Sequence, residues 1–483
     1  MKVLFVSAEV APLAKVGGLA DVAGALPAAL NKLGVDTRVI MPLYKRIRDN
    51  YGCDLKFMRW TMIKLGWRTM YSGLFRMDLN GVTHYFIDNE YYFGHDAIYL
   101  DYDFDIERYC FFQRAVLEAM GAAMDFVPDI IHCNDWQTGL IPALLQAHYH
   151  PYGYFNQVKC FFTIHNLKYQ GVHSFERIAD YCDLSTAFLN DYGILKDGVP
   201  NMMKAGIVYA DQVTTVSPTY AEEIKQPYYG EGLDGVLSYY SFKLKGILNG
   251  IDCREYNPAT DSHLVRTYSS SDVKEGKAAN KAALQAELGL NAEPDRPLLA
   301  MITRMVDQKG MDLLLRVLGE IAGIPTQVVV LGTGEHRYEE GTRICAGYFK
   351  ENIRACLTFD NALAHRIYAA ADIFLMPSLF EPCGLSQLIA MNYGTLPVVR
   401  ETGGLKDTVT PYNQYTMEGN GFSFTNINAH DFLNVVRNAC DLYNDSRDIW
   451  DRLVQNAMHK DVSWQKSAEC YKELYEGVLN RKD

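Results

Sequence analysis

Short apolar runs recur along the chain, and each is bounded by polar or turn-forming residues. They are rich in Val, Ile, Leu and Phe and do not alternate with polar residues, which favours strands buried on both faces of a parallel sheet. The runs form two series, 2–8, 36–42, 129–135, 158–166 and 211–218, then 297–304, 326–332, 352–359, 371–378 and 395–400. We therefore expect one parallel sheet from each series.

Segments with apolar residues at helical spacing lie between these runs. Residues 311–323 and 361–371 are two examples, and residues 463–482 have the pattern of an amphipathic helix. Segment 20–34 is similar but contains Pro27, which we expect to kink that helix or to mark its boundary. Strand–helix alternation with right-handed crossovers predicts an α/β fold with doubly wound sheets.

The alternation occurs twice, which indicates two large domains in the 483 residues. The polar stretch 256–296 has few strand signals, and we interpret it as the crossing between them. We expect a first domain over 1–255, joined by a C-terminal helix within 459–483, and a second over 256–458. The aromatic segment 51–125 predicts edge strands or an insertion beside the first sheet, with a hairpin at the Asn-Gly turn of 79–87.

Composition removes several classes of function. The net charge is −12, from 46 basic and 58 acidic residues, which argues against nucleic-acid binding and against an anionic membrane surface. No apolar run reaches the roughly 20 residues that a membrane span needs. The eleven cysteines include no CxxC pair or zinc spacing, so we expect reduced thiols in a cytoplasmic protein and no metal site. The start, MKVLFVSAEV, lacks the pattern of a signal peptide.

The residues that follow each strand carry the candidate chemistry, because ligands of open α/β sheets bind at the carboxyl ends of the strands. After the first run come Lys15, Gly17 and Gly18, and a helix begins there. Glycines allow close approach of a ligand, and a helix start and a lysine favour an anion, so this segment is a candidate cradle for a phosphate or a sugar. A purely structural turn is the alternative.

A second cluster follows the next strands of the first series. His165 ends one strand, and His132, Asp135 and Trp136 end the strand before it. An acid beside an aromatic ring suits a sugar, since it offers hydrogen bonds to hydroxyls and an apolar face to the ring. The alternatives are a buried core histidine and ordinary loop packing.

The second half contains two cations near one carboxylate. Arg304 ends a strand and Lys309 opens the next helix, which is a suitable arrangement for a pyrophosphate, although both could be solvated surface charges. Glu381 follows a later strand, and residues 383–385 open a helix whose N–H groups could hold phosphate oxygens. A carboxylate beside an anion site fits hydroxyls or a developing cation, both of which a nucleotide sugar offers.

Together these motifs resemble a known family. The segments KVGGLADV, IHN, NGID, TRMVDQKG, FEPCGLSQ and GTLPVVRETGGLKDTV occur in this order from residue 15 to residue 409. They are similar to bacterial glycogen synthases and plant starch synthases, which form glycosyltransferase family five with the GT-B fold. The resemblance implies two Rossmann-like doubly wound parallel-sheet domains that face a deep inter-domain cleft and close over the substrate.

The resemblance also implies an activity. The family moves glucose from ADP-glucose to the non-reducing end of an α-1,4-glucan, with retention at the anomeric carbon and with no metal or other cofactor. Two alternatives stay open: a related GT-B transferase that uses UDP-glucose, and a glucan-binding scaffold that has lost catalysis. The intact motif residues speak against the scaffold. Oligomeric state, regulation and the route of retention, front-face or covalent, are not accessible from the sequence.

Residue roles follow from the same resemblance. It implies catalytic roles for Lys15, His165, Arg304, Lys309 and Glu381. It implies donor-binding positions at Lys15, Gly17, Gly18, Asp21, Asn249, Arg304, Lys309, Phe359, Cys383, Gly384 and Leu385. Within these sets, His165 meets the donor glucose, Glu381 holds its hydroxyls and Phe359 stacks on the adenine. Asp135 and Trp136 are the candidates for the acceptor.

One position separates this chain from other transferases of the same fold. Many retaining GT-B enzymes outside the family carry a second glutamate eight residues after the first, and Ile389 stands at that position here. This departure disfavours a sucrose- or trehalose-type enzyme.

Overall fold

The computed structural model describes residues 1–481 of the protein. The chain forms two compact bodies: unit 1, Met1–Asn249 with Trp464–Asp483, and unit 2, Gly250–Ser463. The division expected from the sequence, 1–255 with 459–483 and then 256–458, places the two boundaries a few residues away. Residues 482 and 483 of the expected first domain and C-terminal helix lie outside the described residues.

Unit 1 is built on one mixed sheet. Its strands, in spatial order, are β11 (Leu244–Gly246), β10 (Gln212–Thr215), β7 (Lys159–Ile164), β6 (Ile130–Asn134), β1 (Lys2–Val6), β2 (Asp36–Pro42), β5 (Val82–Asp88), β4 (Arg68–Leu79) and β3 (Lys56–Leu65). The strands from β11 to β5 run parallel, and β4 and β3 continue the sheet antiparallel. All five apolar runs of the first series form strands, as predicted.

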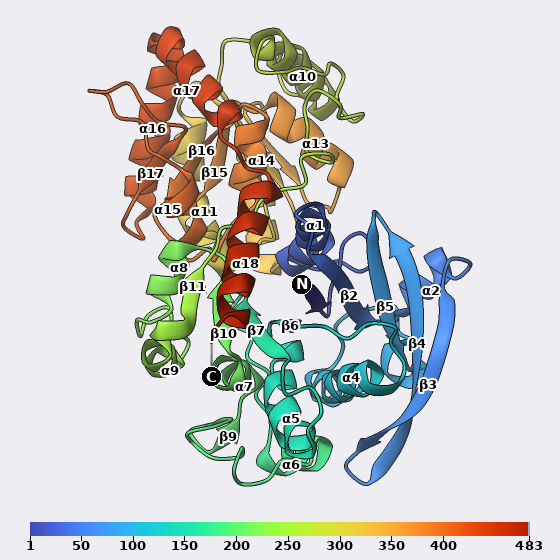
Figure 1. Ribbon diagram of the computed structural model, residues 1–483. Coiled ribbons are helices and arrows are strands. Elements are labelled where there is room, and N and C mark those ends of the chain that lie inside the picture. Colours follow the sequence, from blue (N-terminus) through green and yellow to red (C-terminus); the bar gives the residue numbers. More distant parts are fainter. Residues whose placement is uncertain (482–483) are drawn as a thin grey trace. The chain divides into compact units, whose positions relative to one another are not determined.

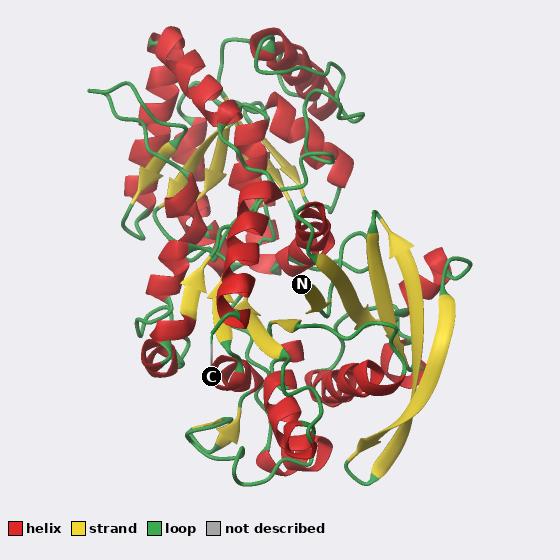
Figure 2. Ribbon diagram, in the orientation of Figure 1, coloured by secondary structure: helices red, strands yellow, loops and turns green. Residues whose placement is uncertain are grey.

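Helices cover the faces of this sheet (Figures 1 and 2). They are α1 (Gly18–Lys32), α2 (Lys45–Tyr51), α3 (Glu90–Phe93), α4 (Tyr102–Ala122), α5 (Ile141–His148), α6 (Phe175–Cys182), α7 (Met202–Tyr209), α8 (Pro218–Glu223), α9 (Asp234–Tyr239), α18 (Trp464–Leu479) and the 3₁₀ turns η1 (Trp136–Thr138), η2 (His150–Tyr152) and η3 (Ser241–Lys243). A short hairpin joins β8 (Leu195–Lys196) to β9 (Val199–Pro200). Helix α1 runs through Pro27, so this proline does not mark a helix boundary; burial of the helix face outweighs the lost backbone hydrogen bond.

The amphipathic helix expected near the C-terminus is α18, and it packs against α1 of unit 1 (Figure 1). The Tyr475 hydroxyl lies 2.5 Å from Nδ1 of His132 on β6, and the ring of Tyr475 meets Phe161 on β7 edge-on. The ammonium of Lys472 donates to the carbonyl of Leu33 at 3.0 Å. Unit 1 is therefore built from two segments of chain separated by all of unit 2.

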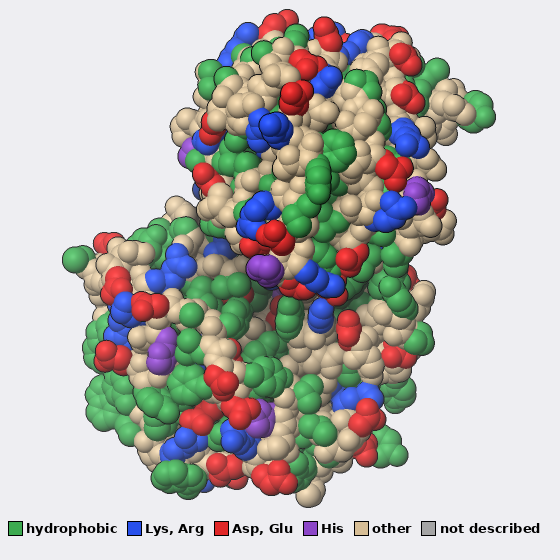
Figure 3. Space-filling model, turned by 180° about the vertical axis from the view of Figure 1, so that it is seen from behind, with side chains coloured by type: hydrophobic (Ala, Val, Ile, Leu, Met, Phe, Trp, Pro, Cys, Tyr) green, Lys and Arg blue, Asp and Glu red, His purple; other side chains and the backbone are tan. Residues whose placement is uncertain are grey.

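Within the aromatic segment 51–125, β3, β4 and β5 continue the sheet to its edge, as predicted, and α3 and α4 follow them. Asn80 and Gly81 join β4 to β5 with φ values of 53° and 76°, the left-handed conformation that a two-residue hairpin turn requires. Edge strand β3 exposes Phe57, Trp60 and Met62. Figure 3 shows hydrophobic side chains gathered along the edge of the molecule to which these strands belong.

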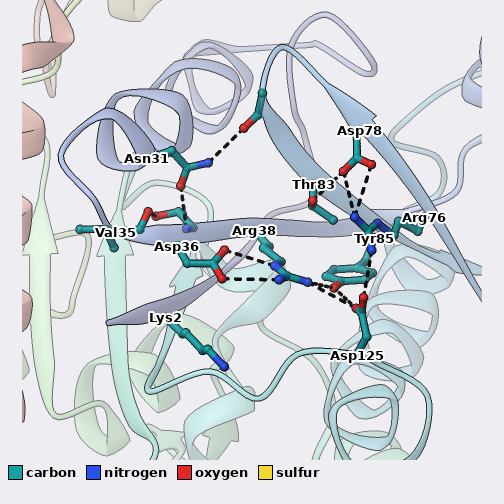
Figure 4. Close-up of polar contacts among 12 residues, drawn as sticks. Lys2, Asn31, Val35, Asp36, Arg38, Arg76, Asp78, Thr83, Tyr85 and Asp125 are labelled. Atoms are coloured by element: carbon teal, nitrogen blue, oxygen red, sulfur yellow. Dashed lines mark hydrogen bonds and ion pairs between the residues drawn. The ribbon is translucent and has the colours of Figure 1, made fainter.

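A polar network connects the edge strands to the rest of the sheet (Figure 4). Asp125, in the loop before β6, accepts hydrogen bonds from Arg76 on β4 at 2.9 Å, from Arg38 on β2 at 3.3 Å and from the hydroxyl of Tyr85 on β5. The guanidinium of Arg38 also lies 4.3 Å from the centre of the Phe126 ring. These contacts fix one loop against three strands.

Unit 2 contains a parallel sheet with helices on both faces (Figure 2). Its strands, in spatial order, are β14 (Ile353–Cys356), β13 (Gln327–Leu331), β12 (Leu298–Ile302), β15 (Ile373–Met376), β16 (Leu396–Arg400) and β17 (Phe422–Phe424). The helices are α10 (Val273–Leu288), α11 (Met311–Ala322), α12 (His336–Tyr348), α13 (Asn361–Ala370), α14 (Ser386–Asn392), α15 (Gly403–Thr408), α16 (Ala429–Asp445), α17 (Arg447–His459) and the 3₁₀ turn η4 (Asp307–Lys309). The second series of predicted strands is confirmed.

Helix α10 lies inside the polar stretch that the sequence indicated only as a domain crossing. Its buried positions include Lys277 and Lys281. The ammonium of Lys277 donates to the hydroxyl of Thr395 at 2.7 Å and to the carbonyl of Ala369 at 3.1 Å, and burial lowers the pKa of Lys277 to about 7. Polar residues that face the core hide the apolar period by which such a helix is recognised.

Candidate active site

The topology of each sheet indicates where a ligand binds. In unit 2 the chain builds outward from β12 to β14 and then starts again at β15 on the other side of β12. In unit 1 the same reversal lies between β1 and β6. Such switch points leave an opening at the carboxyl ends of the two central strands. The candidate residues Lys15, Asp135, Arg304 and Glu381 all follow one of these four strands.

The switch point of unit 2 holds an ion pair between two candidates. The ammonium of Lys309 donates to Oε2 of Glu381 at 2.6 Å, and the hydroxyl of Ser378 donates to the same oxygen at 3.1 Å. Both side chains are largely buried, with exposed fractions of 19% for Lys309 and 7% for Glu381. The sequence identified the lysine and the glutamate but not Ser378.

Backbone contacts hold this pair in place. The N–H of Leu379 donates to the carbonyl of Gln308 at 2.8 Å, and the side-chain amide of Gln308 donates to the carbonyl of Phe380 at 3.3 Å. Arg400, buried at the end of β16, donates from Nε to the carbonyl of Ser378 at 2.9 Å. Sequence reasoning missed Arg400, since nothing in its local pattern shows that it serves a neighbouring loop.

Two glycines explain how the loop that carries Glu381 fits against α15. A Cβ on Gly403 would lie closer than 3.0 Å to the carbonyl oxygen of Glu381, and a Cβ on Gly404 would do the same to Cys383. The N–H of Gly404 donates to the Glu381 carbonyl at 3.1 Å. These glycines thus allow backbone to pack on backbone.

The other candidates of unit 2 follow β12 and β14 or precede α14. Arg304 is exposed two residues after β12, and within residues 1–481 its guanidinium makes no hydrogen bond or ion pair. Phe359 lies beyond β14 and is 87% exposed. Cys383, Gly384 and Leu385 immediately precede α14, and Gly384 has a left-handed φ of 73°. The ring of Phe359 and the guanidinium of Arg304 are accessible to a ligand.

The switch point of unit 1 holds a second lysine–carboxylate pair. The ammonium of Lys15 donates to Oδ1 of Asp21 at 2.6 Å, and burial raises the pKa of Asp21 while the charge of Lys15 opposes that rise. Gly17 caps the first turn of α1 without a side-chain hydrogen bond. A Cβ on Gly17 or Gly18 would meet nothing within 4 Å. The space beside these two glycines is open to a ligand.

A carboxylate that the sequence did not single out also belongs to this segment. Glu9, between β1 and α1, is 4% exposed. Its Oε2 accepts hydrogen bonds from the N–H groups of Val16 at 2.6 Å and of Gly17 at 2.9 Å. In the sequence Glu9 is only an interruption of an apolar run.

Asp135 stands at the end of β6 in an unusual backbone conformation. Its φ is 56°, which is uncommon for a residue other than glycine and concentrates at functional sites. Its Oδ1 accepts the N–H of His165 at 2.8 Å. Burial raises the pKa of Asp135 to about 7, with a smaller contribution from the charge of Glu9 and opposition from backbone hydrogen bonds.

The orientation of His165 can be derived from its partner. Nε2 of His165 lies 2.9 Å from Oδ1 of Asn134, whose amide nitrogen donates to the carbonyls of Val6 and His132. Oδ1 is therefore an acceptor, and Nε2 must carry the proton. Burial lowers the pKa of His165 to about 3, so the ring is neutral near pH 7 and its Nδ1 is an acceptor.

Two residues that the sequence placed near the ligand are core residues. His132 is fully buried between Tyr475 and the hydroxyl of Thr163, at 2.6 Å from its Nε2, so the expectation that it lines the site is wrong. Trp136 is 6% exposed, and a Cβ on Gly171 would lie closer than 3.0 Å to its ring. The structure gives Trp136 a packing role, and its contact with an acceptor remains a prediction.

Asn249, the last residue of the first segment of unit 1, is 8% exposed. Its buried Oδ1 has no hydrogen-bond partner within residues 1–481. A buried amide oxygen without a partner is costly, which is consistent with a position that meets a ligand.

We expect His132 to make unit 1 sensitive to acid. Burial lowers its pKa from 6.5 to about 3, so the neutral ring stabilises the fold above pH 6.5, and this contribution is lost as the pH falls from 6.5 towards 3. Between pH 7.5 and pH 5 the loss is about 2 kcal/mol in the free energy of unfolding. His132→Gln should reduce the pH dependence by that amount, while being less stable than the wild type at pH 7.5.

Urea unfolding followed by tryptophan fluorescence measures this, because four of the five tryptophans belong to unit 1. His95→Gln, a change of an exposed histidine in the same unit, is the matched control and should leave the pH dependence unchanged. Equal acid sensitivity of His132→Gln and the wild type would contradict the expectation.

Neither a metal cluster nor a membrane span occurs in the part of the chain that the structure describes. Among residues 1–481, no group of three or more His, Cys, Asp or Glu side chains is arranged to hold a metal ion. No helix in that range is both long enough and apolar enough to cross a membrane.

Comparisons with known proteins show which families this chain is similar to. The family model of the starch synthase catalytic domain matches residues 2–239, and that of glycosyl transferases group 1 matches residues 287–456. The chain is 49% identical over 477 residues to a glycogen synthase of Exiguobacterium sibiricum, with 98% of each chain covered. It is 49% identical over 480 residues to a glycogen synthase of Clostridium acetobutylicum, covering 99% of this chain and 100% of the relative.

Solved structures agree. The catalytic domain of starch synthase IV from Arabidopsis thaliana, bound to ADP and acarbose, superposes with a TM-score of 0.91 at 35% identity, and the match covers 99% of each chain. A sucrose-phosphate synthase from Thermosynechococcus elongatus shares the fold, with a TM-score of 0.61 at 18% identity over 99% of each chain. The protein is a glycosyltransferase with the GT-B fold. Within that class, the chain belongs to the family of bacterial glycogen synthases and starch synthases.

Proposed function

We propose that this glycosyltransferase transfers glucose from ADP-glucose to the non-reducing end of an α-1,4-glucan, with retention at the anomeric carbon. The observation that carries the proposal is the switch point of unit 2, where Lys309 pairs with Glu381 at 2.6 Å and Arg304 is unpaired within residues 1–481. Two cations suit a diphosphate, and one carboxylate suits sugar hydroxyls. The starch synthase that superposes on the whole chain binds ADP, which supports an adenine nucleotide.

The chemical problem is a leaving group that gains negative charge while the anomeric carbon becomes electron-poor. Cations fixed near the leaving oxygen stabilise this charge without reorganisation. Arg304 and Lys309 fill that role in our proposal, and Lys15 of unit 1 meets a donor phosphate. Binding of the diphosphate replaces part of the Lys309–Glu381 contact and frees carboxylate oxygen for the glucose hydroxyls.

His165 contributes to sugar recognition in this scheme. With its proton on Nε2, the ring presents Nδ1 as an acceptor for a hydroxyl of the donor glucose. Its neutral state keeps that acceptor available near pH 7. Asp135 and Trp136 remain the candidates for the acceptor glucan, and Phe359 for the adenine.

Retention proceeds by front-face attack within one ion pair in our proposal, because none of the candidate residues has the position of an evident nucleophile. Trapping of a glycosyl adduct on Glu381 would overturn this route. We also propose that the reaction needs no metal, since arginine and lysine supply the positive charge at the diphosphate.

A transfer assay tests the function. Radiolabelled ADP-glucose and UDP-glucose are supplied separately with glycogen, with and without EDTA. We expect label in the polymer from ADP-glucose in both conditions, and release of that label as maltose by β-amylase, which digests α-1,4 chains from their non-reducing ends. Label from UDP-glucose alone favours the alternative donor. Binding of glycogen without label from either donor favours a non-catalytic scaffold.

A further inference from the structure

Glu9 occupies the place that a ligand anion would take at the start of α1. Its carboxylate is buried, and Oε2 receives the N–H groups of Val16 and Gly17 at 2.6 and 2.9 Å. Exposed N–H groups at a helix start are the usual donors to a phosphate. The N–H groups of Val16 and Gly17, directly before α1, are already satisfied from within the chain, so they are not available to a donor nucleotide.

The second oxygen of Glu9 reaches the opposite side of the switch point. Oε1 accepts the hydroxyl of Tyr99 at 2.6 Å, and that hydroxyl accepts from the side-chain amide of Gln137 at 3.1 Å. Gln137 belongs to η1, directly after β6, whereas Glu9 follows β1. Within residues 1–481, Glu9 makes no ion pair. Its charge is met by neutral donors alone, and these tie together the two strand ends that frame the site.

Lys15 is the residue that this arrangement controls. It directly precedes Val16, and its side chain is 42% exposed and touches only Asp21 among the carboxylates described. The glycines that follow have no Cβ to restrict the backbone. The N–H groups of Val16 and Gly17 are therefore fixed by Glu9, while the Gly17 carbonyl accepts the N–H of Ala20 at 3.2 Å, and these contacts set the direction of Lys15.

We propose that Glu9 is a positioning residue: it holds the Lys15–Gly18 segment in the conformation in which the Lys15 ammonium, rather than the N–H groups of Val16 and Gly17, meets the donor phosphate. The proposal rests on the function proposed above. In this proposal Glu9 acts as a hydrogen-bond acceptor and its negative charge is not required, because the groups that it contacts are uncharged.

The test combines two substitutions at Glu9 with one at Lys15. Glu9→Gln keeps a carbonyl oxygen for the two N–H groups and should remain within about fivefold of the wild type in kcat/KM for the donor. Glu9→Ala removes the acceptor and should lower kcat/KM about 100-fold, the cost of misplacing a binding group. In a Lys15→Ala background, Glu9→Ala should cost less than about threefold more, since its effect passes through Lys15.

Hydrogen exchange provides a readout that does not depend on activity. The amides of Val16 and Gly17 should be protected in the wild type and in Glu9→Gln and should exchange freely in Glu9→Ala. Glu118→Ala is the matched control, because it removes another carboxylate of unit 1 that accepts a tyrosine hydroxyl, Tyr149, at 2.6 Å. It should leave donor kinetics and the exchange of these amides unchanged.

The outcomes separate the two proposals. A wild-type protein that transfers no glucose contradicts the proposed function. A wild-type protein that is active, with effects of Glu9→Ala and Lys15→Ala that multiply, contradicts the positioning role. If Glu9→Gln is as impaired as Glu9→Ala while its amides stay protected, the charge of Glu9 is what matters, and the inference is wrong. If Glu9→Ala does not fold, Glu9→Gln and the exchange measurement still decide.

Discussion

Lys309→Ala should lower kcat for glucose transfer about 10²–10³-fold, the usual effect of removing one group that stabilises transition-state charge. The KM for the donor should change less than tenfold. The ammonium lies 2.6 Å from Oε2 of Glu381, so its positive charge already has a partner within the chain. Its net gain comes when charge develops on the leaving diphosphate, and an interaction that strengthens in the transition state appears in kcat.

Steady-state kinetics at saturating glucan measures both parameters. Lys350→Ala, which removes an exposed lysine of the same unit, is the matched control and should leave kcat and KM unchanged. A large rise in KM at constant kcat would mean that Lys309 binds ground state and transition state equally, and the assignment to the leaving group would then fail.

The second large effect concerns stability. We expect Gly310→Ala to reduce the free energy of unfolding of unit 2 by at least about 3 kcal/mol, because the new methyl group overpacks the turn and the residue has a positive φ. Gly310 has φ 72°, and a Cβ there would lie closer than 3.0 Å to the carbonyl oxygen of Pro377. Both the turn that carries Lys309 and the loop that leads to Glu381 would have to move apart, so activity should fall with stability.

Gly347→Ala is the control for this change. Gly347 lies within α12, where a Cβ would meet nothing within 4 Å, and alanine there should be neutral or stabilising by about 0.5–1 kcal/mol. Chemical denaturation followed by far-UV circular dichroism gives both values. If Gly310→Ala is as stable as Gly347→Ala, the close approach of the two loops is not a requirement of the fold.

Much of the fold follows from the sequence because parallel strands buried on both faces leave uninterrupted apolar runs. All ten such runs form strands, and the Asn-Gly turn of 79–87 forms the hairpin that it indicates. The elements that the sequence did not predict lack such an uninterrupted apolar run. Helix α10 was not recognised because some of its buried positions are lysines that donate to carbonyl groups. Strands β11 and β17 are too short to give a pattern.

Candidate site residues could be named from the sequence for a related reason: ligands of open α/β sheets bind at the strand ends, and the strands were recognisable. The sequence cannot tell which way a polar side chain at a strand end points. His132 lies in the middle of β6 and its side chain faces the core towards Tyr475, whereas His165 directly follows β7 and its side chain turns towards Asn134. Glu9 and Arg400 were missed because their partners are backbone groups of other segments, and Ser378 was missed because nothing in the local sequence distinguishes a serine three residues before Glu381.

The split composition of unit 1 has a consequence for how this protein is made. Synthesis proceeds at roughly 5–20 residues per second, so α18 leaves the ribosome some tens of seconds after β11, once all of Gly250–Ser463 has been translated. Unit 2 can therefore fold completely while unit 1 still lacks α18, the helix that covers His132 and Phe161. Premature termination just before Trp464 would thus leave the N-terminal sheet with an uncovered aromatic face, a natural substrate for chaperones.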